Sequence, residues 1–352
     1  MIASDRFRRW AARFPIVRSI AKRRARALFD LTAGFVYSQV LAACVRLKLF
    51  DLLKHGPLTV EALSGHFLLT NDATLLLLKA AASLDLAERL PDGRYGLGQL
   101  GAAVSGQPSL LAMIEHHAML YADLADPVAL LRGELSATQL SQFWCYTKIA
   151  SPDWTTVAYS ALMTKSQAFI ANDVLDAFPL ERFRALLDVG GGEGAFVNAC
   201  ATRYSNLRCV VFDLPSVAER AKKRFSHPLT DRVTVHGGDF FVDPLPLGAD
   251  IVTLVRVLHD HDDDFVRLLL RRVRSALPKG GTLLVAEPLG GTRGAEPVGD
   301  AYFGFYLAAM GRGRPRTFGE IAALLREAGF CTAKLVPTAA PMVVSLISAR
   351  AA

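Results

Sequence analysis

The sequence predicts an α/β protein with a Rossmann-like, doubly wound sheet, a closing antiparallel hairpin and an N-terminal α-helical winged-helix domain. Three observations predict this fold. From about residue 183 onwards, strand patterns alternate with helical patterns, which is typical of a mostly parallel sheet. Two strand patterns follow each other at the carboxyl end, as in a hairpin. Residues 28–105 show three helical patterns followed by the turn signal Asp92-Gly93, which is the order of a winged helix.

The composition is that of a globular protein long enough for two domains. The 352 residues are 51% hydrophobic and 21% charged. No apolar run reaches the ~18 residues that a membrane span needs, and no cleavable secretory signal is visible. Five cysteines, none in a Cys-x-x-Cys pair, predict a reducing compartment without disulfides or a zinc site. We therefore expect a cytoplasmic protein without a membrane span.

Residues 1–27 form a basic amphipathic arm. They contain nine Lys and Arg side chains and one aspartate, a net charge of +8, whereas the rest of the chain sums to −1. Phe7, Trp10 and Phe14 recur at helical spacing until Pro15 interrupts the pattern. Such a helix is typical of peripheral membrane contact, and equally of docking on a partner subunit. Both interpretations stay open.

The winged-helix domain, residues 28–105, is expected to form a dimer surface. A DNA-recognition helix needs basic and polar side chains, but the candidate helix over 71–83 offers Lys79 and a run of leucines. Over residues 56–100, three basic residues stand against five acidic ones, a net −2. These features favour a homodimer and argue against specific nucleic-acid binding.

The other expected elements follow from periodicity. Residues 106–180 form a helical connector rich in aromatic residues, part of which we expect to be a lid over the substrate, and residues 181–352 form the α/β domain. The expected helices cover 33–50, 194 onwards, 216–225, 263–277 and 318–329, and the expected strands cover 185–189, 208–213, 233–236, 249–258, 281–287, 332–336 and 342–348.

A glycine-rich turn follows the first strand of the α/β domain. Asp188-Val-Gly-Gly-Gly-Glu-Gly194 puts a strand, a tight turn and a helix start in succession. Glycines let the backbone turn sharply and let a ligand approach the helix N-terminus. The turn lacks the Gly-x-Gly-x-x-Gly register of dinucleotide sites. We expect Asp188, Gly190, Gly192 and Gly194 to bind a cofactor other than NAD.

Acidic residues end the next two strands. Asp213, followed by Leu214, ends the second strand, where a carboxylate accepts hydrogen bonds from ribose hydroxyls. Asp239 lies between Gly238 and Phe240 after the third strand, where it suits an adenine amino group with Phe240 beside the ring. The glycine turn, one carboxylate placed for the ribose and one placed for the adenine together predict a bound adenosine moiety. Carboxylates that only cap helices are the competing interpretation.

The fourth strand ends in Arg256-Val-Leu-His259-Asp260-His261. A histidine with a pKa of roughly 6.5 at the carboxyl edge of the sheet is a candidate general base. The alternatives are that His259 caps a helix or packs in the core, or that it binds a metal with His261. We expect no metal, because the aspartates that follow open a helix and suit its dipole, and we expect His261 to face solvent. Glu287, which ends the fifth strand, is placed to hold a histidine ring or to line the pocket.

These motifs resemble those of the plant-type small-molecule O-methyltransferases, which use S-adenosylmethionine. The resemblance covers roughly residues 30–350: the winged domain, Asp-Val-Gly-Gly-Gly-x-Gly, Phe-Asp-Leu-Pro, Gly-Asp-Phe-Phe, Leu-His-Asp and the final Gly-x-x-Arg-Thr-x-x-Glu block. The arm running into Ala-Leu-Phe-Asp-Leu-x-Ala-Gly-Phe-Val-Tyr-Ser-Gln is most similar to the members that methylate the tertiary hydroxyl of the carotenoids hydroxyneurosporene or demethylspheroidene.

The resemblance implies S-adenosylmethionine as the cofactor of residues 181–352 and a dimerisation role for the winged domain. It implies that His259 is the general base and that Glu287 supports it. Arg256 and Asp260 are then expected on the cofactor side, with Asp260 also able to orient the base.

The sequence departs from the family pattern at two positions. Pro315 stands where a second supporting glutamate is expected, and His261 stands where a tryptophan is expected. A phenol loses its proton to imidazole much more readily than an aliphatic alcohol does. Methylation of an alcohol therefore depends more on aligning the oxygen with the methyl group than on full deprotonation. A base supported by one glutamate in place of two suits such an acceptor. We expect His259 to remove the proton late in the step.

An aromatic segment before the last helix is the candidate acceptor wall. We expect a pocket for a lipophilic small molecule, although core packing gives the same pattern. Its expected residues are Met163, Tyr302, Phe303, Tyr306 and Met310. The alternatives are O- or C-methylation of a phenolic, polyketide or tetrapyrrole precursor, and a methyl-donor-sensing winged-helix regulator. A nucleic-acid methylase is not expected, because the fourth strand is not followed by Asn/Asp-Pro-Pro-aromatic.

Overall fold

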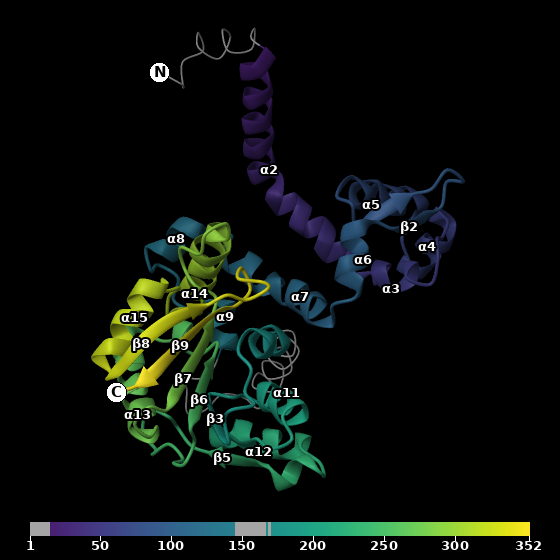
Figure 1. Ribbon diagram of the computed structural model, residues 1–352. Coiled ribbons are helices and arrows are strands. Elements are labelled where there is room, and N and C mark those ends of the chain that lie inside the picture. Colours follow the sequence, from purple (N-terminus) through teal and green to yellow (C-terminus); the bar gives the residue numbers. More distant parts are fainter. Residues whose placement is uncertain (1–14, 145–166, 168–169) are drawn as a thin grey trace. The chain divides into compact units, whose positions relative to one another are not determined.

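The computed structural model describes residues 15–144, 167 and 170–352, and for residues 15–18 it describes the backbone alone. The chain divides into two compact units, residues 1–115 and 116–352 (Figure 1). Most of the predicted basic arm and Met163 of the predicted acceptor pocket lie outside the described residues.

The N-terminal unit has the predicted winged-helix order. Its elements are α2 (Pro15–Arg46), α3 (Leu49–Leu53), α4 (Val60–Phe67), α5 (Asn71–Ser83), the antiparallel strands β1 (Ala87–Arg89) and β2 (Tyr95–Leu97), and α6 (Gln99–Ser105), after which α7 (Pro108–Asp123) begins. The hydroxyls of Thr59 and Thr70 accept from backbone amides in the first turns of α4 and α5, so both helices begin at capping residues. Leucines from α3, α4 and α5 meet in one buried core.

The first helix differs from the prediction. One continuous helix runs from Pro15 to Arg46, through the expected boundary between arm and winged domain at residue 27. Pro15 is the first described residue of this helix, so the predicted interruption at Pro15 stays a prediction. The left-handed backbone of Lys48, with φ of 57°, separates α2 from α3, which the prediction had joined.

The same helix corrects the expectation that no segment suits a membrane span. Ser19–Arg46 is long and apolar enough to cross a membrane, with a mean hydropathy of 1.5 over its best 18-residue window. Only 17% of that window is buried in the structure. Core helices and signal sequences pass the same test, so length and composition alone fix no location.

The C-terminal unit is built on a seven-stranded sheet of order β5-β4-β3-β6-β7-β9-β8. All neighbouring strands are parallel except β9, which pairs antiparallel with β7 and β8, so the predicted closing hairpin is confirmed. The strands are β3 (Ala185–Val189), β4 (Arg208–Asp213), β5 (Val233–Gly237), β6 (Ile251–Val255), β7 (Thr282–Glu287), β8 (Phe330–Val336) and β9 (Ser345–Ala351). The chain leaves β6 earlier than expected and forms a short 3₁₀ turn, η2 (Leu258–Asp260).

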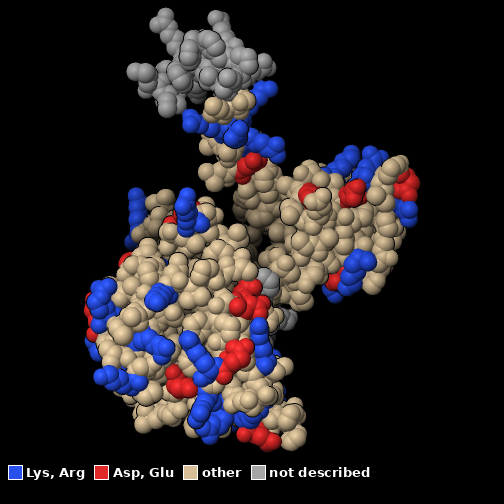
Figure 2. Space-filling model, in the orientation of Figure 1, with Lys and Arg blue, Asp and Glu red and all other residues tan. Residues whose placement is uncertain are grey.

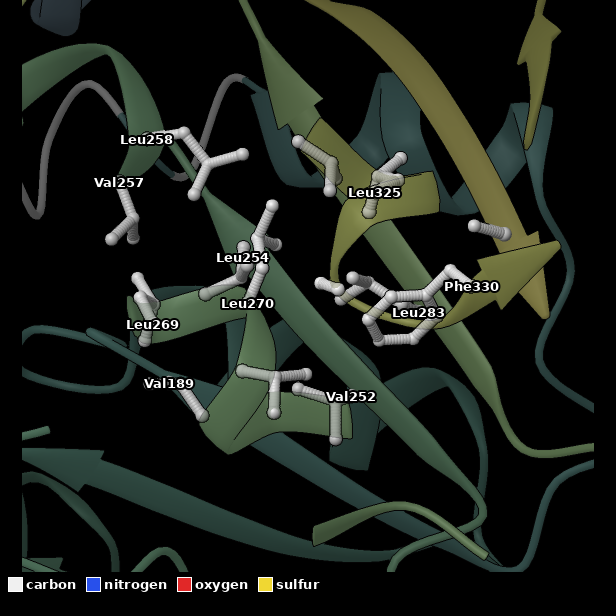
Figure 3. Packing of buried hydrophobic residues seen from close by; sticks show 14 of the residues in the cluster. Val189, Val252, Leu254, Val257, Leu258, Leu269, Leu270, Leu283, Leu325 and Phe330 are labelled. Atoms are coloured by element: carbon white, nitrogen blue, oxygen red, sulfur yellow. The ribbon is translucent and has the colours of Figure 1, made fainter. Parts of the chain in front are cut away.

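Helices cover both faces of this sheet. The helices are α8 (Pro127–Leu131), α9 (Gln139–Phe143), α11 (Ala195–Arg203), α12 (Pro215–Arg224), α13 (Asp263–Ala276), the π-helix η3 (Pro297–Phe303), α14 (Gly304–Met310) and α15 (Phe318–Glu327), with a short 3₁₀ turn η1 (Leu229–Asp231). Val252 and Leu254 of β6 pack on the face covered by α13 and α15 (Figure 3), whereas Ile251 and Val255 pack on the face covered by α11 and α12. The sheet is therefore doubly wound, as predicted.

The strand order reverses around β3, which lies between β4 on one side and β6 on the other. In an open α/β sheet, ligands bind at such a point, outside the carboxyl ends of the strands. The carboxyl ends of β3, β4, β5, β6 and β7, together with the segments that follow them, contain every acidic and glycine residue that the sequence singled out, and they meet at this edge.

Candidate active site

A cavity of about 350 Å³ lies at the carboxyl edge of the sheet. It is enclosed by the segments that follow β3, β4, β5 and β6, together with the start of α13 and the loop after α14. The described residues that line it are Gln167, Gly190, Gly192, Glu193, Asp213, Leu214, Val217, Asp239, Phe240, Phe241, Arg256, Val257, Asp260, His261, Phe265 and Arg312. The cavity therefore gathers eight of the predicted cofactor residues at one place.

The glycine turn supplies bare backbone to the cavity. Gly190 has φ of 70°, and a Cβ there would lie 2.9 Å from a methyl of Val257. Gly192 also has a positive φ, and its N–H donates to Oδ2 of Asp213 at 2.7 Å. Gly194 and Gly238 do not line the cavity. A Cβ at either would overlap an aromatic ring, so both allow close packing behind the turn.

Asp188, predicted to bind the cofactor, is buried beneath the turn and does not line the cavity. Its Oδ1 accepts from the hydroxyl of Thr253 at 2.6 Å, and its Oδ2 has no hydrogen-bond partner among the described residues. Burial raises the pKa of Asp188 to about 7. Asp188 thus lies beneath the glycine turn, and its predicted contact with the cofactor stays a prediction.

Asp213 and Asp239 both reach the cavity. The Asp213 carboxylate accepts from the backbone amides of Gly192 and Leu214, each at 2.7 Å, and burial raises its pKa to about 6. Oδ1 of Asp239 accepts from the amide of Phe241 at 2.8 Å. A carboxylate has about four lone-pair sites, so each acid keeps acceptor capacity for a ligand.

His261 contradicts the expectation that it faces solvent. It is 9% exposed and packs edge-on against Phe240 and Phe241, with ring centroids 5.6 and 5.1 Å away. Burial lowers its pKa to about 4, so the ring is neutral at pH 7. His261 therefore occupies the family's tryptophan position as an uncharged aromatic ring on the cavity wall.

His259 is held by Glu287. Oε1 of Glu287 accepts from the amides of Val257 and Leu258 at 2.9 and 2.6 Å, and Oε2 is in hydrogen-bond contact with Nδ1 of His259. Nε2 of His259 lies 3.1 Å from Oδ1 of Asp260. Burial alone would lower the pKa of His259, but the two carboxylates outweigh burial and raise it. His259 is buried and is not among the described residues that line the cavity.

The segment around Pro315 supports the histidine from behind. The amide of Arg314 donates to the carbonyl of His259 at 3.0 Å, and a Cβ at Gly313 would overlap that carbonyl. Arg316 is 2% exposed and donates to the carbonyls of Leu258 and His261, each at 2.7 Å. Where the family pattern has a second glutamate, this chain therefore holds the loop by backbone contacts and a buried arginine. Arg316 stands in the Gly-x-x-Arg-Thr motif, but the motif did not indicate this role.

The described aromatic residues of the predicted acceptor wall, Tyr302, Phe303 and Tyr306, contact one another. The hydroxyl of Tyr306 lies 2.6 Å from Nε2 of His116, and the hydroxyl of Tyr302 lies 2.7 Å from Nε2 of His117. Burial lowers the pKa of both histidines. Phe303 packs edge-on against His259, with ring centroids 6.2 Å apart. Tyr302, Phe303, Tyr306 and Met310 do not line the described part of the cavity, so their contact with an acceptor stays a prediction.

Sequence reasoning missed several cavity residues. Phe241 and Phe265 add to the aromatic wall, and Arg312 adds a cation. Phe241 directly follows Phe240 in the Gly-Asp-Phe-Phe motif, so the motif could have indicated it. Phe265 and Arg312 come from a helix and a loop that carry no motif. Across the described ranges, no cluster of three or more His, Cys, Asp or Glu side chains is arranged to hold a metal ion.

Comparison with known proteins gives consistent matches over both units. The sequence profile of the O-methyltransferase domain matches residues 121–331, and that of the O-methyltransferase dimerisation domain matches residues 29–105. Demethylspheroidene O-methyltransferase of Cereibacter sphaeroides is 46% identical, covering 99% of this chain and 93% of the relative. The Rhodobacter capsulatus protein of the same description is 39% identical over 99% of this chain and 87% of its own length. The crystal structure of human N-acetylserotonin methyltransferase in complex with SAM superposes with a TM-score of 0.77 at 30% identity, covering 93% of this chain and 97% of that one.

Proposed function

Because this chain belongs to the O-methyltransferase family, we propose that it transfers a methyl group from S-adenosylmethionine to the tertiary hydroxyl of an acyclic carotenoid, such as hydroxyneurosporene or demethylspheroidene. The observation that carries the acceptor class is the 46% identity, over 99% of the chain, to a demethylspheroidene O-methyltransferase. The geometry at the edge of the sheet supports the reaction type.

The cavity fits the methyl donor. Its loops offer bare glycine backbone, two carboxylates with spare acceptor sites, and an aromatic wall for a flat ring. Asp213 would accept from the ribose hydroxyls and Asp239 from the adenine amino group, with Phe240 and Phe241 against the ring. Arg256 and Asp260 line the end of the cavity next to His259. S-adenosylmethionine supplies, when bound, a methyl group on a positively charged sulfur that an oxygen nucleophile can attack.

The acceptor's proton passes to an acid–base group centred on His259. Glu287 fixes the orientation of the ring through Nδ1 and raises its pKa, which strengthens it as a base. Phe303 packs edge-on against the imidazole of His259. Packing against these two rings would therefore align the acceptor oxygen, in addition to the proton transfer to His259. Replacement of His259 by alanine should abolish most of the turnover, and near-normal turnover would contradict this role.

The acceptor would lie against the aromatic segment formed by the end of η3 and by α14; Met163, also predicted to contact it, lies outside the described residues. Tyr302 and Tyr306 satisfy their hydroxyls on His117 and His116. Because these hydroxyls are already hydrogen-bonded, the two tyrosines offer a ligand mainly their apolar ring faces. Such a surface suits a hydrocarbon chain better than a polyphenol.

A carotenoid is delivered from a membrane, and α2 suits contact with one. Lys22, Arg23, Arg24 and Arg26 are exposed, and the same helix then exposes Leu28, Phe29, Leu31, Phe35 and Val36. Figure 2 shows the basic side chains gathered on the part of α2 next to the grey residues. A basic segment beside apolar side chains binds anionic membrane surfaces. We place the enzyme on the cytoplasmic face of the inner membrane as a peripheral protein.

The dimerisation domain makes the working unit a homodimer. The exposed apolar residues of α2 suit contact with a partner subunit as well as with lipid. Variants of the basic residues therefore distinguish membrane binding from dimer formation. Replacing the four basic residues at 22, 23, 24 and 26 by glutamine should weaken flotation with phosphatidylserine vesicles and leave the dimer intact in size-exclusion chromatography. Unchanged flotation would refute the membrane contact.

Labelled S-adenosylmethionine tests the function directly. The purified protein is incubated with a 1-hydroxycarotenoid in detergent, and separately with a panel of simple phenols, and the products are identified by mass spectrometry. We expect label on the carotenoid hydroxyl and none on the phenols. Label on a phenol alone would refute the carotenoid assignment and favour the phenolic alternative. Donor binding without any product would favour the donor-sensing regulator.

A further inference from the structure

We propose that His116 and His117 of α7 determine which acceptor the enzyme takes, because each pairs with a tyrosine hydroxyl of the predicted acceptor wall and so keeps that wall apolar. The inference rests on the proposed methylation of a carotenoid and names the residues that favour an apolar acceptor over a phenol. It gives the two histidines a specificity role, separate from the proton transfer at His259.

The hydroxyl of Tyr306 is fully engaged in hydrogen bonds. Nε1 of Trp144 donates to it at 3.2 Å, and Nε2 of His116 lies 2.6 Å away. An indole N–H is a donor only, so the Tyr306 oxygen accepts from Trp144 and its own proton is directed to His116. Tyr306 is buried, so an unpaired proton there would be costly. A bound acceptor therefore finds no free donor on this hydroxyl.

His116 is suited to accept that proton. Burial lowers the pKa of His116 to about 4 and raises the pKa of the Tyr306 hydroxyl, so at pH 7 the imidazole is uncharged and the hydroxyl keeps its proton. A neutral imidazole has one nitrogen that accepts, and here that nitrogen is Nε2. The second pair has the same character: Nε2 of His117 lies 2.7 Å from the Tyr302 hydroxyl, burial lowers the pKa of that histidine, and burial raises the pKa of the tyrosine to about 12.

Contacts between α7 and α9 fix the ring of His116. The carboxylate of Asp123, the last residue of α7, accepts from the amides of Gln139 and Leu140 at the start of α9, at 2.7 and 2.9 Å. Phe143, at the other end of α9, packs against the imidazole with ring centroids 4.7 Å apart. The accepting nitrogen is therefore held in place, so its pairing with the tyrosine needs no rearrangement.

Ring contacts link the two tyrosines to the reacting centre. The Tyr302 ring lies 5.9 Å from that of Tyr306 and 5.0 Å from that of Phe303, centroid to centroid. Phe303 in turn stands edge-on to the imidazole of His259. An acceptor placed to transfer its proton to His259 would therefore lie along these rings.

An unpaired hydroxyl on this wall would change the preference of the site. Beside a hydrocarbon chain such a hydroxyl stays unsatisfied, whereas a phenol can form a hydrogen bond with it. Breaking a histidine–tyrosine pair should therefore shift the preference toward a phenol by about ten- to a hundredfold.

Competition between a 1-hydroxycarotenoid and a simple phenol tests this assignment in the full-length enzyme. His116→Leu removes the accepting nitrogen and should lower the ratio of the two kcat/KM values, carotenoid over phenol, by at least about tenfold. His116→Gln is the matched control, because its side-chain oxygen can accept from Tyr306, and it should retain most of the wild-type ratio. Donor affinity should be unchanged in both, since neither His116 nor Tyr306 lines the described cavity. An unchanged ratio in His116→Leu, even with a lower Tm, would overturn the proposal.

Tyr306→Phe gives a second measurement that does not depend on the folding of the leucine variant. It leaves Nε2 of His116 without the tyrosine proton, so a phenol can donate to that nitrogen and the ratio should again fall. The double variant, His116→Leu with Tyr306→Phe, has neither atom and should prefer the carotenoid more than either single variant does. A double variant less selective than both single variants would overturn the proposal, because structural defects accumulate whereas the loss of both partners does not.

Phenol binding separates this inference from the proposed function. Calorimetry with a simple phenol uses protein saturated with S-adenosylhomocysteine, which has no methyl group to transfer. Binding should be tighter to His116→Leu than to wild type, and the double variant should lose this gain. If the wild-type protein methylates no hydroxycarotenoid, the proposed acceptor fails and phenol binding still decides the role of His116. Equal phenol affinities in the three proteins would overturn that role.

Discussion

Replacing Glu287 by glutamine tests how the site is held together. The glutamate is 1% exposed at the end of β7 and makes three contacts, to the amides of Val257 and Leu258 and to Nδ1 of His259. Glutamine keeps one oxygen for the two amides. It loses the negative charge that faces His259, and its amide nitrogen no longer complements an Nδ1–H.

The expected loss of stability follows from burial. Breaking a buried charged pair by changing one partner costs about 3–5 kcal/mol, and His259 keeps a second carboxylate in Asp260, so we expect the lower end, about 3 kcal/mol. For a domain of roughly 200 residues this lowers Tm by about 6–12 °C. The pKa of His259 is raised in the folded protein, so the stabilisation is full below the unfolded pKa and is lost as the pH rises through the folded pKa. The difference in Tm should therefore be larger at about pH 6 than at about pH 9.

Calorimetric unfolding and steady-state kinetics measure both consequences. We expect kcat to fall by about 10²–10³-fold, with donor affinity unchanged, since Glu287 does not line the cavity. Glu327→Gln is the matched control, because the same chemical change removes an exposed ion pair with Arg267 and should cost under ~1 kcal/mol. A Glu287→Gln protein with the Tm and kcat of wild type would show that Glu287 does not support His259.

Three further predictions concern the loops around the cavity. Gly190→Ala should weaken donor binding by about tenfold or more in calorimetry, because a methyl at positive φ approaches Val257, whereas Gly248→Ala, also at positive φ but in open space, should bind donor normally. His261→Phe should reduce the loss of Tm that occurs as the pH falls from about 6.5 to about 4. Because the folded pKa of His261 is about 4, the unfolded state binds more protons in this range, which costs the wild-type protein roughly 3 kcal/mol of stability. Equal slopes of Tm against pH in the two proteins would contradict this. Arg316→Lys should lose about 2–4 kcal/mol in urea unfolding, because an ammonium cannot replace the guanidinium fork; full stability would argue against its bracing role.

The sheet was predictable because its signal is local. The strands β3 and β4 begin and end where periodicity placed them. The end of β6 was predicted too late, because Arg256 adopts a left-handed backbone with φ of 56° and turns the chain out of the sheet. The helix α2 was predicted in pieces, a short apolar stripe after Pro15 and a helix over 33–50, because the change from basic to apolar residues near residue 27 was interpreted as a domain boundary.

The site was predictable where a motif fixed it and not where packing did. The glycine turn, Asp213 and Glu287 occupy strand ends, and their positions follow from topology. The burial of His261 depends on two phenylalanines from another loop, and the support from Arg316 depends on carbonyls more than fifty residues away in sequence. Such contacts leave no periodic pattern, so a single sequence does not reveal them.

Competition between a carotenoid and a phenol tests the proposed acceptor. One reaction contains the enzyme, labelled S-adenosylmethionine, a 1-hydroxycarotenoid and a simple phenol at equal concentrations, and the two methylated products are counted over time. The ratio of product rates equals the ratio of the two kcat/KM values. We expect a preference for the carotenoid of at least ~10²-fold. A ratio near one, or a preference for the phenol, would contradict it.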